Sequence, residues 1–167
     1  MNYIKIGTIV NTHGIKGELR ILSKFEFKKR VFIPNTKIYI GEKHIEETIN
    51  TYRPHKMFDM VTLKNYNNIN EVLKFKNEFV YIDKEILNLD ASEYLETDII
   101  GLNIIEKNQI IGGIIDIYET GKNHKVLEAV INDKKALIPY QKEFIKKIDL
   151  DNNTIELNLI EGLIIWE

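Results

Sequence analysis

The residues best suited to catalysis or to binding a charged ligand lie close together near the N-terminus, in the stretch GTIVNTHGIKGELRI at positions 7–21. It holds His13, Lys16 and Arg20, residue types that transfer protons, ligate metals or bind phosphate. A general base needs a nucleophile and an orienting group beside it, and this stretch supplies neither. The residue types therefore favour binding through positive charge over catalysis. A histidine that only hydrogen-bonds the loop is the plainer alternative, and it stays open.

A tight loop must position these side chains. Strand-like alternation ends at Val10, a loop spans residues 11–17, and a second strand-like run begins at Glu18. Gly14 and Gly17 lie within the loop, where glycine permits a positive φ that a Cβ would oppose. We therefore predict that at least one of these two glycines has φ above zero.

A second basic cluster, RPHK at 53–56, ends another strand-like run. Basic residues at the loop end of a small barrel suit contact with phosphate, although a solvated hairpin end explains the cluster equally simply. His44, His55 and His124 show neither HxH nor HExxH spacing, which argues against a metal site. The motifs GxGxxG and GxxxxGK[ST] are absent from the sequence, so we expect no nucleotide cofactor.

Composition limits the class of protein. The chain has 167 residues, 44% of them hydrophobic, which suffices for one medium domain or two small ones. It contains no cysteine, so disulfides, thiolate metal sites and thiol catalysis are excluded. The N-terminus lacks the pattern of a signal peptide, and no apolar run approaches the roughly 18 residues of a membrane span. We therefore expect a cytoplasmic protein that does not enter a membrane.

The charge is distributed unevenly along the chain. Residues 1–90 carry 15 basic and 11 acidic side chains, whereas residues 91–167 carry 8 and 14, so a net charge of +4 precedes one of −6. This asymmetry fits either two different partners or mutual attraction between the halves, and charge alone does not separate these interpretations.

Period-two alternation predicts short strands through the first half of the chain. They are expected at residues 3–10, 18–21, 36–40, 45–52, 60–63 and 79–82, with turns at 41–43 and 57–59. Residues 68–75 predict a short helix, because Ile69, Val72 and Leu73 share one face and Asn68 can cap its start. Short strands with a single helix favour a small barrel over a sandwich.

A polar, acidic stretch at residues 83–97 predicts a linker, which we place at 86–97 between domains at 1–85 and 98–167. The second half predicts another all-β unit. Its strands are expected at residues 102–105, 110–117, 126–131, 136–138, 148–150 and 154–159, with a loop at 120–125. Gly112 and Gly113 inside a strand predict a bulge or a barrel corner. The predicted fold class is all-β, with two small β-barrels joined by a short linker.

Ordered motifs extend over nearly the whole chain. After GTIVNTHGIKGELRI come RPHK, NINEVLKFKNEFVYI, EYLETDIIGL at 93–102, IGGIIDI at 111–117, LIPY at 137–140 and EGL at 161–163. Each motif alone is moderately specific, but this order and spacing resemble the RimM family of bacterial ribosome maturation factors.

This resemblance implies an N-terminal six-stranded barrel of the kind shared with translation factors, followed by a PRC-type barrel. It also implies a non-catalytic factor that assists assembly of the head of the small (30S) subunit and 16S rRNA processing, without cofactor or metal. The implied partners are the small ribosomal subunit, 16S rRNA and the small-subunit ribosomal protein numbered nineteen. The protein is expected to be a monomer.

With the resemblance, the basic first half suggests an rRNA-binding surface. We expect rRNA phosphates to be contacted by basic side chains of the two clusters. These are His13, Lys16, Arg20, Arg53 and Lys56.

The acidic second half suits a basic protein partner, and the resemblance indicates Tyr94, Leu95 and Asp98 as contacts. Two departures from the family pattern matter here. The family's adjacent tyrosines read Tyr94-Leu95, which removes one ring and its hydroxyl hydrogen bond. The family's GANDV loop reads GKNHKV at 121–126, which is more basic.

Two functions of other classes stay open at this point. One is a barrel enzyme that binds flavin or a nucleotide, because fold alone does not decide function. The other is an adaptor that binds only protein and never RNA. Flavin absorbance in the purified protein would favour the first, and a lack of affinity for small-subunit rRNA would favour the second.

Overall fold

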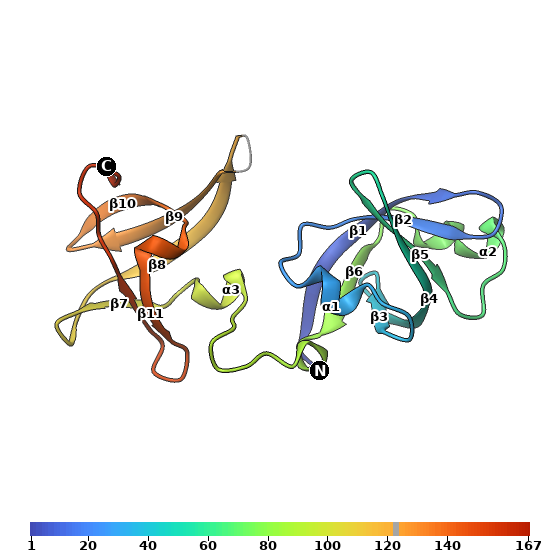
Figure 1. Ribbon diagram of the computed structural model, residues 1–167, viewed down its shortest axis with the longest axis horizontal. Helices are drawn as coiled ribbons and strands as arrows, with labels where there is room; N and C mark the ends of the chain where they lie inside the picture. The colour runs from blue at the N-terminus through green and yellow to red at the C-terminus, as the bar shows by residue number, and fades with distance from the viewer. Residues whose placement is uncertain (122–123) are drawn as a thin grey trace. The chain divides into compact units, whose positions relative to one another are not determined.

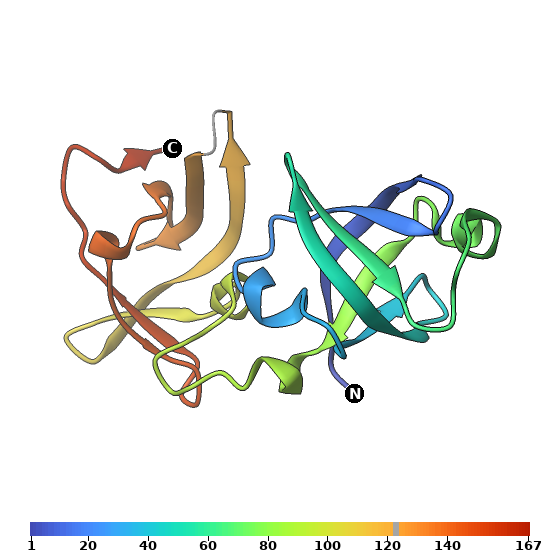
Figure 2. The same cartoon turned by 45° about the vertical axis from the view of Figure 1, so that its right-hand side comes forward.

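The chain folds as two compact units, Met1–Asp90 and Ala91–Glu167, in a computed structural model that describes residues 1–121 and 124–167 (Figures 1 and 2). The boundary between the units lies inside the segment 86–97 that the sequence indicated as a linker. Each unit has its own sheet, and the two are described separately below.

Residues on either side of this boundary are packed into their own unit. The short 3₁₀-helix η2 (Lys84–Leu87) ends on Leu87, which is buried. The Arg30 guanidinium donates a hydrogen bond to the Leu87 carbonyl over 3.0 Å, which ties η2 to the first unit. Leu95, in the second unit, is also buried. The stretch between these two buried residues, 88–94, is therefore shorter than the linker predicted at 86–97.

The first unit is a closed barrel of six antiparallel strands in the order β1-β2-β5-β4-β3-β6, which confirms the predicted architecture. β1 pairs with both β2 and β6, and this double pairing closes the ring. Alternate side chains fill the interior, as shown by the fully buried Leu19 and Ile21 of β2. The strands are β1 (Tyr3–His13), β2 (Glu18–Leu22), β3 (Lys37–Ile40), β4 (Ile45–His55), β5 (Phe58–Leu63) and β6 (Phe79–Asp83).

β1 is longer than the sequence predicted, and the loop after it is shorter. A loop was predicted at residues 11–17, but only residues 14–17 form the turn, because Thr12 and His13 pair with β2. The ladder resumes after a register shift that follows Ile9. Polar side chains on this exposed end of the strand carry no hydrophobic alternation, so periodicity alone ended the strand too early.

The turn predicted at 57–59 was also misplaced. Phe58 and Asp59 belong to β5, where they pair with His55 and Pro54 of β4. Aspartate is common in turns, because its side chain can hydrogen-bond the backbone nearby. Here the aspartate is buried and its carboxylate has partners within the barrel, so tertiary contacts override the local preference.

Two short helices accompany the barrel. Helix α2 (Ile69–Val72), continued by the 3₁₀-helix η1 (Leu73–Phe75), confirms the predicted helix, and the Asn68 side chain accepts from the Glu71 N–H over 3.3 Å as its cap. Helix α1 (Lys28–Val31) was not predicted, because four residues are too few to show a helical period. Within residues 1–121 and 124–167, no helix is long and apolar enough to cross a membrane.

The turn between β1 and β2 lies against α2, as both views show (Figures 1 and 2). The Ile69 N–H donates to the Ile15 carbonyl over 3.0 Å. Gly14 and Gly17 have φ of 70° and 86°, which confirms the predicted positive φ. A Cβ at Gly17 would lie 2.9 Å from the Asn68 carbonyl oxygen, whereas one at Gly14 would meet open space. Gly17 is therefore needed both for its positive φ and for the close approach to Asn68, whereas Gly14 is needed only for its positive φ.

The second unit is a seven-stranded sheet in the order β11-β12-β7-β8-β9-β10-β13, which confirms an all-β second domain. β12 and β7 pair in parallel, and the other neighbours are antiparallel. The strands are β7 (Asn103–Glu106), β8 (Gln109–Thr120), β9 (His124–Ile131), β10 (Lys134–Pro139), β11 (Ile145–Asp149), β12 (Thr154–Leu157) and β13 (Ile165–Trp166). Helix α3 (Glu96–Ile99) and the 3₁₀-helix η3 (Lys142–Phe144) complete it.

Gly112 allows β8 and β9 to approach each other closely. A Cβ at this position would lie 1.8 Å from the Val130 carbonyl oxygen, which no side chain tolerates. The register of β8 against β9 shifts nearby, between Ile114 and Asp116, as the predicted bulge requires. Of the predicted loop at 120–125, residues 122 and 123 lie outside the described residues.

The two glycines of the β1–β2 turn give a test of this packing. We expect Gly17→Ala to lower the free energy of unfolding by about 2–3 kcal/mol, because strain at positive φ adds to a clash with backbone. Gly14→Ala should cost only about 1 kcal/mol, from the positive φ alone. Urea unfolding followed by far-UV circular dichroism measures both. Trp166, the single tryptophan, lies in the second unit, so its fluorescence midpoint should not move. Equal losses for the two variants would contradict this account.

Candidate nucleic-acid interface

Strand register gathers basic side chains from distant parts of the chain onto one side of β2, β5 and β4. Met60 of the middle strand, β5, lies opposite Arg20 of β2 on one side and Arg53 of β4 on the other. Met60 is fully buried between them. At the end of β1, His13 pairs with Glu18 of β2. Because side chains alternate along a strand, these residues point away from the interior that Leu19 and Ile21 fill. We call the surface formed by His13, Arg20, Arg53 and His55 the basic face.

Arg20 is the centre of the basic face. Its Nη2 lies 2.9 Å from His13 Nδ1, and its guanidinium lies over the Phe58 ring, 5.1 Å from the ring centre. A guanidinium only donates, so His13 Nδ1 accepts this hydrogen bond. Arg20 Nε is buried, and among the described residues it has no hydrogen-bond partner.

Arg53 forms an ion pair with Glu18. Its Nε and Nη2 donate to the two carboxylate oxygens over 2.8 and 2.6 Å, which is the bidentate geometry of strong Arg–carboxylate pairs. The hydrogen bond from Arg53 lowers the pKa of Glu18 against the opposing effect of burial, and the positive charge of Arg53 lowers it further. The sequence indicated Arg53 as a phosphate contact. Its Nη1 edge points away from Glu18 and is the part that suits that role.

His55 lies in a strongly positive environment. Its ring lies 6.0 Å from that of His13, measured between ring centres. Burial lowers the pKa of His55, and the positive charges of Arg53, Lys56, His13 and Arg20 lower it further. Burial and the neighbouring cations therefore disfavour the protonated imidazole, and an anion that neutralised these cations would favour its protonation.

Lys16 and Lys56 flank the basic face on turns. Lys16 lies in the exposed β1–β2 turn, three residues after His13. Lys56 lies in the β4–β5 turn, with φ of 54°, and is exposed. The structure therefore brings His13, Arg20 and Arg53 together and places the two lysines at the turns beside them.

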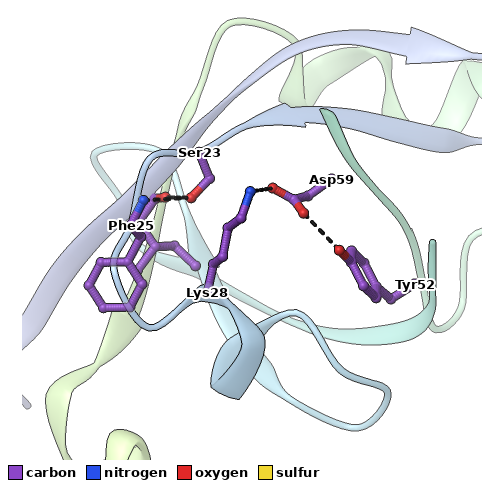
Figure 3. A network of polar contacts seen from close by, with 6 residues as sticks. Ser23, Phe25, Lys28, Tyr52 and Asp59 are labelled. Carbon is purple, nitrogen blue, oxygen red and sulfur yellow. Dashed lines mark hydrogen bonds and ion pairs between the residues drawn. The ribbon is translucent and has the colours of Figure 1, made fainter. Parts of the chain in front are cut away.

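A second set of polar contacts joins α1 to β5 (Figure 3). Asp59 is 2% exposed, and its carboxylate accepts from Lys28 Nζ over 3.1 Å and from the Tyr52 hydroxyl over 2.8 Å. Burial, with the hydrogen bond to Asp59, raises the pKa of Tyr52 to about 12, so the hydroxyl stays a donor. The Tyr52 ring packs against that of Phe32, with ring centres 6.1 Å apart.

In the second unit, the three residues indicated for a protein partner differ in accessibility. Leu95 is 1% exposed, which corrects the expectation that its side chain meets a partner. Its N–H donates to the Asp98 carboxylate over 3.0 Å, so Asp98 caps the start of α3. Tyr94 is partly buried, and with Tyr140 it lines an open hollow of about 490 Å³. Of the three, Tyr94 is the residue best placed for contact.

Several residues of these sites were not indicated by the sequence. Glu18 and Phe58 join the basic face only through strand pairing, and Asp59 joins the buried contacts in the same way. His55 belongs to the RPHK cluster, but its spacing from the other histidines predicts no role for it. Its position opposite Phe58 in a hairpin was the available signal, because hairpin partners share a face.

Comparison with known proteins gives the family. The family models for the RimM N-terminal domain and the RimM PRC barrel domain match residues 4–87 and 96–163. Relatives named Ribosome maturation factor RimM include those of Staphylococcus haemolyticus and Ligilactobacillus salivarius. The first is 39% identical, covering 96% of this chain and 98% of the relative. The second is 40% identical, covering 98% and 99%.

The relative from Bacillus subtilis is 36% identical, and the alignment covers 97% of each chain. A solved RimM structure from Pseudomonas aeruginosa is 20% identical, with a TM-score of 0.42 over 95% of this chain and 98% of that one. Both domain models match in order, and full-length relatives exceed one-third identity. This chain therefore belongs to the RimM family of ribosome maturation factors.

Proposed function

We propose that this chain assists maturation of the small ribosomal subunit by binding, without making or breaking covalent bonds. The first unit binds 16S rRNA through the basic face, and the second binds a small-subunit ribosomal protein around Tyr94. A binding protein shifts rRNA toward the conformations it prefers, by no more than its differential affinity for them. Family membership supports the class of function. The observation that carries the RNA-binding part is the strand register that gathers Arg20 and Arg53 opposite Met60, beside Lys56 of the β4–β5 turn.

The basic face suits a phosphate group better than a carboxylate substrate or a protein side chain. Positive charge from Arg20, Arg53 and Lys56 converges near His55. Guanidinium groups bind phosphate with paired hydrogen bonds, and such contacts supply affinity without reading sequence. Glu18 moderates the charge, since its carboxylate neutralises one edge of Arg53. The protein would therefore recognise the shape of an rRNA backbone.

The second unit suits a basic protein partner. Residues 91–167 have a net charge of −6, and Glu96 and Glu143 line the hollow that Tyr94 and Tyr140 form. Tyrosine is enriched where interfaces bury an aromatic ring and keep its hydroxyl hydrogen-bonded. Leu95 would act indirectly, because its burial fixes the backbone from which the neighbouring Tyr94 projects.

The RNA assignment is tested with the full chain carrying Lys16→Ala and Arg20→Gln together. We expect affinity for a 16S rRNA transcript at low salt to fall about tenfold or more, because two phosphate contacts are lost. The slope of log K against log salt should become shallower by about 1.5. The charge-matched control is Lys43→Ala with Lys76→Ala, two exposed lysines of the same unit. Affinity that matches this control would favour the adaptor that binds only protein.

A second test uses pH. The cations around His55 hold its pKa low in the free protein, and a bound phosphate would offset them. RNA binding should then take up a proton, so affinity should rise several-fold as the pH falls from about 7.5 to about 6, around the ordinary histidine pKa of about 6.5. Calorimetry in buffers of different ionisation enthalpy measures the proton uptake. His55→Gln should reduce it, and His124→Gln, in the second unit, should not. Proton release on binding would overturn this coupling.

A third test concerns Tyr94. Tyr94→Ala should weaken binding of the purified small-subunit ribosomal protein nineteen about tenfold or more, as truncation of a buried interface aromatic typically does. Tyr118→Ala, a partly buried tyrosine on β8 of the same unit, is the control for general loss of packing. Circular dichroism melts establish that both variants fold. Undiminished binding by Tyr94→Ala would place the protein-binding surface elsewhere.

A further inference from the structure

A cavity of about 320 Å³ lies in the first unit, between α1 and the β4–β5 turn. Its volume is at the lower end of the range of about 300–1,000 Å³ typical of small-molecule sites. That suits a ligand the size of one nucleotide. The side chains that matter for recognition are Lys28, Lys29, Tyr52, Lys56, Phe58 and Asp59.

The cavity adjoins the basic face through shared residues. Phe58 lines the cavity and also lies under the Arg20 guanidinium. Lys56 lines the cavity and contributes to the positive field around His55. An RNA strand whose phosphates contact Arg20 would therefore pass the mouth of this cavity.

The rim of the cavity is positively charged. Lys29 and Lys56 are exposed, and the Lys28 side chain is 41% exposed. The one carboxylate among the lining residues named above, Asp59, is paired with Lys28. Two lysines therefore remain in excess at the rim, which favours a ligand that carries a phosphate.

The wall and floor suit a nucleobase. Tyr52 and Phe58 provide aromatic surface, and stacking on aromatic rings is the usual way in which unpaired bases are bound. At the floor, each Asp59 oxygen accepts one hydrogen bond, from Lys28 or Tyr52, and keeps a second lone pair. Since Asp59 accepts and does not donate, it complements the amino group of adenine or cytosine and opposes the O4 carbonyl of uracil.

We propose that this cavity binds one unstacked nucleotide of rRNA. Its phosphate lies on Lys29 and Lys56, its base contacts Tyr52 and Phe58, and its exocyclic amino group donates to Asp59. The inference rests on the proposed RNA binding by the first unit and adds a base-reading site to a surface that otherwise contacts only phosphates.

The test is an NMR titration of the full chain with matched 5′-mononucleotides. CMP and UMP differ at the 4-amino group, and AMP and IMP differ at the 6-amino group; ribose 5-phosphate lacks a base. We expect CMP and AMP to shift the ring resonances of Tyr52 and Phe58 and to bind about fivefold or more tightly than UMP and IMP. Equal response to all five compounds would mean phosphate binding only and would overturn the proposal, as would no response.

Two variants identify the site. Asp59→Asn should remove the preference for CMP over UMP, with circular dichroism as the control for folding. Lys29→Ala changes an exposed residue and should weaken CMP binding about threefold or more, whereas Lys43→Ala should not. CMP affinity unchanged by Lys29→Ala would overturn the site. Binding of the 16S rRNA transcript is measured in parallel. If the unaltered chain binds no nucleotide but still shows Arg20-dependent binding of the transcript, the cavity alone is rejected. If it binds neither, the proposed function is rejected.

Discussion

Closure of the first barrel is the constraint on which the rest of the first unit depends. Six short strands close only if β1 pairs with β2 on one side and β6 on the other, and each pairing has a fixed register. That register makes Arg20 and Arg53 partners of the same residue, Met60. A shift by one residue would turn these arginines inward. The basic face is thus a consequence of the same pairing that builds the core.

The two arginines of the basic face each have a partner on the same face. Glu18 neutralises part of Arg53, and His13 accepts a hydrogen bond from Arg20, so both guanidinium groups are oriented before any ligand arrives. Preorientation of this kind reduces the entropy lost on binding. Asp59 plays the corresponding part beside the face, because its buried carboxylate holds Lys28 and Tyr52 in place. Paired charges therefore fix the shape of this surface before any ligand binds.

In the second unit, two adjacent residues, Tyr94 and Leu95, differ in how deeply their side chains are buried. Leu95 is buried and Tyr94 is partly exposed, while the Asp98 carboxylate accepts from the Leu95 backbone and fixes the start of α3. Leucine at position 95 is therefore compatible with the fold, since its apolar side chain is buried.

The sequence by itself determined features that depend on local chemistry. Alternation identified the strands, Asn68 identified a helix start, and Gly14 and Gly17 identified positive φ, because each reflects a residue's own steric or hydrogen-bonding preference. The ordered motifs likewise gave the family. Tertiary structure alone decided that Glu18 pairs with Arg53, 35 positions away, and that Asp59 lies in a strand. Those outcomes depend on which strands become neighbours and in what register, and no local preference specifies that.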